Sequence, residues 1–122
     1  MHFGEYKVKP GYPEILQHGA DVTLATYGSS VRIAQEAIRH LEEAGVSVEL
    51  IDVQSLIPFD VDHHIVASLR KTNRLVVLDE DVPGGASAYI LQKILEEQGG
   101  YRHLDAPPLT IASKEHRPAY VS

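Results

Sequence analysis

The turn Gly28-Ser29-Ser30 is the first place in this sequence where chemistry is conceivable, since it lies between a predicted strand and a predicted helix. The first N–H groups of a helix lack partners within the helix, and the helix dipole is positive there, so such a turn can hold a phosphate or a carboxylate. The turn lacks both the G-x-G-x-x-G pattern and the lysine of a phosphate loop. We therefore predict that the serine hydroxyls cap the helix, which stabilises it by roughly 1 kcal/mol over alanine. Anion binding is the weaker alternative.

Three consecutive acids, Asp79, Glu80 and Asp81, follow a predicted strand. Carboxylate oxygens are the usual ligands of a hard cation such as magnesium. Side chains along an extended segment alternate in direction, however, so neighbouring carboxylates would not share one ion without a bend. We predict a solvent-exposed strand end, with Glu80 as the acid best placed to meet a positive group across an interface.

The histidines form no recognisable catalytic or metal-binding set. His63 and His64 are neighbours on a predicted helix and point roughly 100° apart, whereas joint chelation favours a spacing of four. His103 and His116 lie in predicted loops without an evident carboxylate partner or nucleophile. The sequence has no cysteine, which excludes thiolate metal sites and thiol nucleophiles. We therefore assign no catalytic, cofactor-binding or metal-binding residue from the sequence.

Length and charge restrict the class of protein. The 122 residues are enough for one domain that buries roughly two-thirds of its unfolded surface. The net charge of −6, with 11 scattered lysines and arginines, argues against a nucleic-acid partner, whose phosphates need clustered cations. It suits protein partners that carry basic patches. The apolar runs have only strand length, so we expect a soluble cytoplasmic protein that does not bind membranes.

The candidate turn belongs to a predicted strand-helix-strand unit over residues 21–53. A strand rich in apolar and β-branched residues ends at Gly28, and a helix with apolar residues at steps of three and four continues to Gly45. An apolar strand follows over residues 46–53. This spacing is typical of a right-handed parallel crossover. We expect three large side chains of the helix, Ile33, Ile38 and Leu41, to be buried against a sheet.

The remaining elements extend this unit. Asp60 is placed to cap a helix over residues 61–72, whose buried stripe is Val61, Ile65 and Leu69. The other predicted elements are an edge strand within residues 12–17, a strand at 75–78, a helix at 87–98 that stops at Gly99-Gly100, and a strand at 109–112.

Four stretches carry a family resemblance: DVTLATYGSSVRIAQEA, VSVELIDVQSLIPFD, KTNRLVVLDE, and Gly84-Gly85 opening a helix. In combination they resemble the C-terminal domain of thiamine-diphosphate enzymes of the transketolase type, and more closely the beta subunit of 2-oxoacid dehydrogenases. The resemblance implies a three-layer α/β/α fold with a mixed five-stranded sheet in the order 1-3-2-4-5, strand 1 being antiparallel. On that topology Gly28 to Ser30 and Asp79 to Asp81 flank one crevice at the switch point of the sheet.

The resemblance also implies a function. The intact enzyme is an oxidoreductase that decarboxylates a 2-oxo acid, branched-chain or pyruvate, and transfers the acyl group to lipoamide. Its thiamine diphosphate and magnesium lie between two other domains, and the thiamine-binding motif that begins Gly-Asp-Gly is absent here. We therefore expect residues 1–122 to be a single assembly domain from a longer chain that is inert alone. The partners implied are other domains of the same enzyme, the alpha subunit or region, the dihydrolipoyl acyltransferase core and a second copy in a homodimer.

Two alternatives stay open. The chain could be a stand-alone doubly wound module that binds a nucleotide or another anion at Gly28 to Ser30. It could also belong to a different thiamine enzyme such as transketolase itself, for which SLIPFD is a poorer match.

Overall fold

The crossover predicted within residues 21–53 forms in the computed structural model, which describes residues 11–79 and 86–112. It consists of β2 (Val22–Thr26), α1 (Ser30–Glu43) and β3 (Val48–Asp52). The two strands pair in parallel, with Leu24 opposite Leu50. Gly45 has a φ of +90° immediately after the helix, which confirms its role in ending α1.

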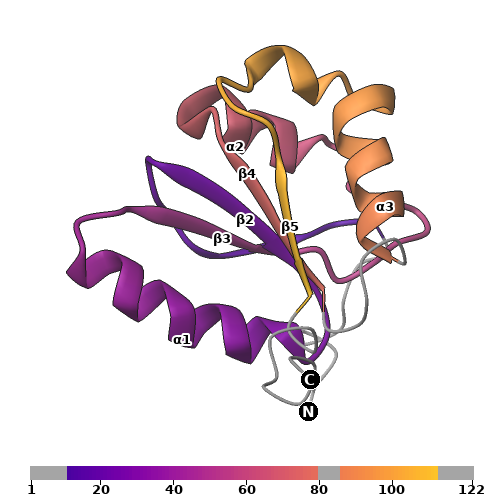
Figure 1. Ribbon diagram of the computed structural model, residues 1–122. Coiled ribbons are helices and arrows are strands. Elements are labelled where there is room, and N and C mark those ends of the chain that lie inside the picture. Colours follow the sequence, from indigo (N-terminus) through magenta and orange to yellow (C-terminus); the bar gives the residue numbers. More distant parts are fainter. Residues whose placement is uncertain (1–10, 80–85, 113–122) are drawn as a thin grey trace, which may run out of the picture.

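The sheet has five strands in the order β1-β3-β2-β4-β5 (Figure 1). β1 (Glu14–Gln17) pairs antiparallel with β3, whereas β4 (Leu75–Asp79) and β5 (Leu109–Ala112) continue the parallel sheet on the other side of β2. The predicted fold class, strand order and direction of the first strand are therefore confirmed.

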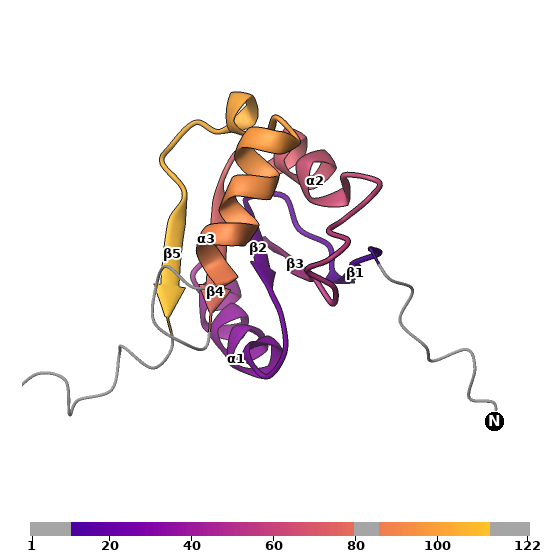
Figure 2. The same cartoon turned by 90° about the vertical axis from the view of Figure 1, so that its right-hand side faces the viewer.

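The helices cover the sheet unequally. α1 lies on one face, and α2 (His64–Thr72) and α3 (Ala86–Leu91) lie on the other (Figures 1 and 2). α3 continues into a π-helical segment, η2 (Gln92–Glu97), and a 3-10 helix, η3 (Gly100–His103), follows the left-handed Gly99. The sequence places His103 in a loop, whereas the structure forms η3 there. None of the described helices combines the length and apolarity that a bilayer crossing requires.

Two apolar cores lie on the two faces because side chains alternate along each strand. The core under α2 and α3 includes Ala25, Ile65 and Ile90, whereas the core under α1 includes Leu24 and Ile38.

α2 begins three residues later than predicted. The two carboxylate oxygens of Asp60 accept hydrogen bonds from the backbone N–H groups of His64 and Ile65, each at 2.8 Å. Asp60 therefore caps the helix as predicted, but it does so across an intervening turn in which His63 N–H donates to the Asp60 carbonyl. Val61 lies in this turn and is 44% exposed, so its predicted place in the buried stripe is wrong.

The prediction for the apolar face of α1 is partly wrong. Ile38 is buried as expected, whereas Ile33 is 45% exposed and Leu41 is 39% exposed. Both exposed residues lie on the side of α1 that faces away from β3. In the described part of the chain, no second helix on this face of the sheet covers them.

Candidate functional site

The carboxyl ends of β2 and β4 lie side by side, which brings the two candidate segments together. Thr26 and Leu78 are paired residues, and the Thr26 hydroxyl donates to the Leu78 carbonyl at 2.9 Å. Beyond Thr26, the Tyr27 hydroxyl donates to Asp79 at 3.0 Å. Since β2 leads through α1 to β3 on one side and β4 lies on the other, this is the switch point at which open sheets usually hold ligands.

The Gly28-Ser29-Ser30 turn differs from its prediction as a serine cap. Neither serine makes a side-chain cap hydrogen bond, because Ser29 already has helical dihedrals and Ser30 is fully buried. The Ser30 hydroxyl has no hydrogen-bond partner in the described part of the chain. A hollow of about 610 Å³ lies beside the turn, lined by Gly28 and Ser29 and by Arg32 and Glu36 of α1. Gly28 has a φ of +64° and leaves open space where a side chain would stand.

Asp79 is buried rather than solvent-exposed, so its prediction as part of an open strand end is wrong. Its two carboxylate oxygens accept hydrogen bonds from the Tyr27 hydroxyl and from the backbone N–H of Ser87, at 3.0 and 3.1 Å. Asp79 thus joins the end of β2 to the start of α3. Glu80 and Asp81, and also Gly84-Gly85, lie outside the described residues.

The electrostatics of this end of the sheet do not favour a strong anion site. Asp52 stands at the end of β3, and burial raises the pKa of its carboxyl group. The N–H of Gln54 offsets part of that effect, and the carboxylate of Glu14 raises the pKa further. Arg32 is the one cation among the described residues that line the hollow.

The described histidines are not gathered into a site. His63 is exposed, His64 lies 3.5 Å from Asp60, and His103 is in η3. No group of three His, Asp or Glu side chains in the described ranges could hold a metal ion. His116 lies outside these ranges. The described residues at the switch point contain no nucleophile with an adjacent base.

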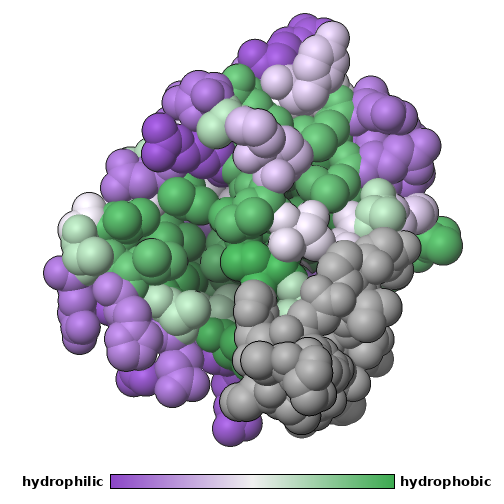
Figure 3. Space-filling view, in the orientation of Figure 1, coloured by the Kyte–Doolittle hydropathy of each residue, from purple (hydrophilic) through white to green (hydrophobic). Residues whose placement is uncertain are grey.

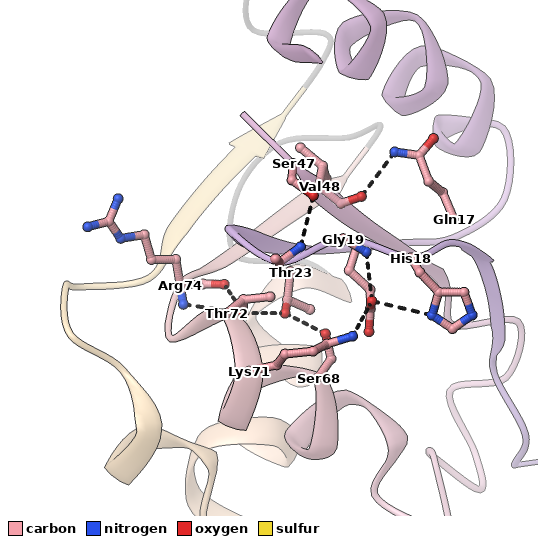
Figure 4. Close-up of polar contacts among 12 residues, drawn as sticks. Gln17, His18, Gly19, Thr23, Ser47, Val48, Ser68, Lys71, Thr72 and Arg74 are labelled. Atoms are coloured by element: carbon pink, nitrogen blue, oxygen red, sulfur yellow. Dashed lines mark hydrogen bonds and ion pairs between the residues drawn. The ribbon is translucent and has the colours of Figure 1, made fainter. Parts of the chain in front are cut away.

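At the opposite end of the sheet, the buried Glu49 forms an ion pair with the half-exposed Lys71, which the sequence did not predict (Figure 4). Glu49 of β3 is 2% exposed and accepts hydrogen bonds from Lys71 Nζ at 2.7 Å and from the N–H of Gly19 at 2.9 Å. A side chain at Gly19 would collide with the backbone of Val48 and Glu49, so this close approach requires glycine. The signal in the sequence is a carboxylate inside an apolar strand, which needs a partner when it is buried.

A hydroxyl cluster lies beside this pair. Thr23 of β2 contacts Ser68 at 2.6 Å and Thr72 at 2.7 Å, both hydroxyl to hydroxyl. All three residues are buried, so these bonds attach α2 to the sheet through polar groups that would otherwise be unsatisfied.

Comparisons with known proteins match the whole described region. The model of the family "Transketolase, C-terminal domain" matches residues 11–121. The acetoin:2,6-dichlorophenolindophenol oxidoreductase subunit beta of Bacillus subtilis (strain 168) is 39% identical over 102 residues, which are 84% of this chain and 29% of that protein. The pyruvate dehydrogenase E1 component subunit beta of Staphylococcus epidermidis is 35% identical over 112 residues, which are 91% of this chain and 34% of the relative.

A solved structure supports the same comparison. A split gene transketolase, described as an inactive beta4 tetramer, superimposes with a TM-score of 0.71 at 26% identity. The match covers 88% of this chain and 34% of the other. The chain thus spans about a third of the length of the proteins it matches.

Proposed function

Because the chain belongs to the transketolase C-terminal domain family, we propose that it is the assembly domain of the beta subunit, or of a fused chain, in a 2-oxoacid dehydrogenase. The intact enzyme would decarboxylate a 2-oxo acid and pass the acyl group to lipoamide. The observation that carries this proposal is the match to proteins named as beta subunits of such enzymes, which covers 91% of this chain in the pyruvate dehydrogenase relative.

The polar groups at the switch point support an assembly role. The candidate acid Asp79 is fully buried and serves to join β2 to α3, so it does not face a substrate. The proposed partners are the alpha subunit or region, the other domains of the same enzyme and the acyltransferase core. Their contacts would involve surface residues, for which the acidic net charge of −6 suits a basic partner.

The described residues do not fit thiamine diphosphate and its magnesium. Magnesium held by a diphosphate takes one or two carboxylates of the protein, whereas both carboxylate oxygens of Asp79, the described acid at the switch point, already accept hydrogen bonds from Tyr27 and from the N–H of Ser87. We therefore propose that other domains hold the cofactor, and we derive no catalytic step from this domain.

A domain replacement tests the assembly role. Residues 11–121 would replace the matching third of the Staphylococcus epidermidis beta subunit, which would then be co-expressed with its alpha subunit. We expect the chimera to copurify with the alpha subunit and to regain decarboxylase activity, whereas a beta subunit without its C-terminal third should do neither. Sedimentation and 2-oxo acid turnover measure the two properties.

A chimera that folds by circular dichroism and still fails to assemble would contradict the proposal. The chimera carrying Ile38→Glu, which places a charge in the core under α1, is the matched control and should fail with the loss of fold.

The hollow beside the Gly28 turn supports a second candidate, an anion-binding module. The observation in its favour is Arg32, a cation that lines the hollow beside Gly28 and Ser29. A thermal-shift titration with phosphate, pyrophosphate and ATP distinguishes the two. Saturable binding at about a hundred times the dissociation constant should stabilise the chain by about 2.7 kcal/mol, and Arg32→Ala should reduce the gain. No shift with any of the three anions argues for assembly alone.

A further inference from the structure

The two edges of the sheet differ in character. At the β5 edge, Leu109 is 54% exposed, and apolar side chains gather over the sheet above α1 (Figure 3). At the opposite edge, where β1 lies beside β3 (Figure 2), two carboxylates face each other. Glu14 of β1 and Asp52 of β3 are directly paired in the antiparallel register. Like charges in such a pair repel each other, because the Cβ atoms of opposed residues are typically only about 5 Å apart.

The described surroundings of the pair supply no cation to offset this repulsion. Neither carboxylate forms an ion pair with any residue in the ranges 11–79 and 86–112. Thr26, which pairs with Asp52 from β2, is uncharged. Asp52 is half-buried, and this burial raises the pKa of its carboxyl group. Glu14 is the one charged group of the described chain that shifts this pKa, and it raises the pKa further, so the two acids are coupled.

Gln54 bridges the two carboxylates without adding a charge. Its side-chain amide donates to Glu14 Oε1 at 3.2 Å, and its backbone N–H donates to Asp52 Oδ1 at 3.2 Å. These bonds offset part of the rise in the pKa of Asp52. The bridge therefore brings both carboxylates to one uncharged residue and leaves their repulsion in place.

The other end of β1 is held by contacts that contain no like-charge pair. The Gln17 side-chain amide donates to the Val48 carbonyl at 3.0 Å and to Glu42 of α1 at 2.6 Å. The register of β1 shifts between Ile15 and Gln17, which separates this end from Glu14. The attachment of the Glu14 end can therefore change with charge while the Gln17 end stays in place.

We propose that Glu14, Asp52 and Gln54 form an acid-strengthened clasp, in which one proton taken up from solvent fastens the Glu14 end of β1 to β3 and its loss loosens that end. Just ahead of this end, the Gly11 carbonyl accepts a hydrogen bond from the N–H of Val61 at 2.9 Å, so the clasp also steadies the turn before α2. The inference goes beyond the assembly role and does not depend on it.

The direction of the pH effect follows from the raised pKa of Asp52. A carboxyl group with a raised pKa binds its proton more tightly in the closed form than in the open form. The closed form is therefore favoured as the pH falls toward the raised pKa, and this advantage is lost as the pH rises through it.

Amide hydrogen exchange of the full chain, followed residue by residue by NMR at about pH 7 and about pH 4.5, tests the clasp. Protection factors, which are corrected for the intrinsic effect of pH on exchange, report the opening of each strand. We expect the protection of the β1 amides to rise about two- to fivefold at the lower pH relative to the β2 amides, which report the sheet as a whole.

Glu14→Gln and Asp52→Asn each remove one charge and keep an oxygen that accepts hydrogen bonds. Each should raise the protection of β1 at about pH 7 by about two- to fivefold and remove most of its pH dependence. The double variant should gain little more, because either substitution alone ends the repulsion. Gln54→Arg, which adds a cation beside both carboxylates, should also raise the protection at about pH 7 and abolish the rise in acid.

Glu42→Gln is the matched control, since it removes an acid that contacts the other end of β1. It should leave the pH dependence of the Glu14 end unchanged. Protection of β1 that stays constant or falls between about pH 7 and about pH 4.5 overturns the proposal. A rise that persists in Glu14→Gln, Asp52→Asn or Gln54→Arg, or that Glu42→Gln abolishes, overturns it as well.

Discussion

Replacing Ile38 with alanine is expected to lower the free energy of unfolding by about 2 to 5 kcal/mol. Ile38 is 2% exposed and packs in the core under α1 with Leu24 and Leu50. Its truncation removes buried apolar surface and leaves a cavity between α1 and the sheet, and the two losses add. Urea unfolding of the wild-type and variant chains measures the difference.

Ile33→Ala is the matched control, since it makes the same chemical change five residues earlier on the same helix. Ile33 is 45% exposed, so we expect a loss below about 1 kcal/mol. If Ile38→Ala and Ile33→Ala lowered the free energy of unfolding equally, Ile38 would not be on the side of α1 that packs against the sheet, and the assigned orientation of the helix would be wrong.

The contrast between Ile38 and Ile33 shows what periodicity can predict. Steps of three and four identify a helix and its apolar side, and α1 forms where they indicate. They do not show how much of that side the sheet covers. Because α1 lies over β3 and β2, the residues on the side toward β5 stay open to solvent. The strand order likewise followed from the family resemblance rather than from the pattern of residues.

The candidate site was harder to predict because its polar groups are satisfied by distant partners. Asp79 is buried through contacts with Tyr27, which lies 52 residues away in the sequence, and with the backbone N–H of Ser87. Asp60 caps its helix as predicted, because its partners are four and five residues away. The local cap at Asp60 could be inferred from the sequence, whereas the contacts between strand ends, and the burial of Ser30 that prevents a serine cap on α1, depend on the packed sheet.

Replacing Lys71 with methionine should lower the free energy of unfolding by about 1 to 3 kcal/mol at pH 7. The change keeps most of the aliphatic side chain and removes the ammonium group that lies 2.7 Å from Glu49. Lys71 itself is half exposed and loses little, so the loss comes from the Glu49 carboxylate, which stays buried with fewer partners.

The pH dependence of this loss identifies the Glu49 carboxylate as its cause. Burial raises the pKa of Glu49, but the hydrogen bonds from Lys71 and the N–H of Gly19 outweigh it, so the pKa lies below its ordinary value of 4.5. A carboxyl group with a lowered pKa stabilises the folded state at pH values above its ordinary pKa. This contribution disappears as the pH falls through the lowered pKa. Lys71→Met removes the largest of the causes that lower this pKa, so the pKa of Glu49 rises, and acid relieves the buried charge. The difference between wild type and variant should therefore shrink as the pH falls below 4.5.

The Glu49→Gln background completes the test, because glutamine keeps the shape and an acceptor for the Gly19 N–H without the charge. In this background Lys71→Met should cost less than about 0.5 kcal/mol, since no buried charge remains to lose its partner. Urea unfolding of the four chains at pH 7 and at about pH 3.5 gives the full cycle. Lys71→Met could instead lower the free energy of unfolding equally at both pH values, or equally with Gln and with Glu at position 49. Either result would show that packing of the lysine stem, and not the ion pair, holds α2 to the sheet.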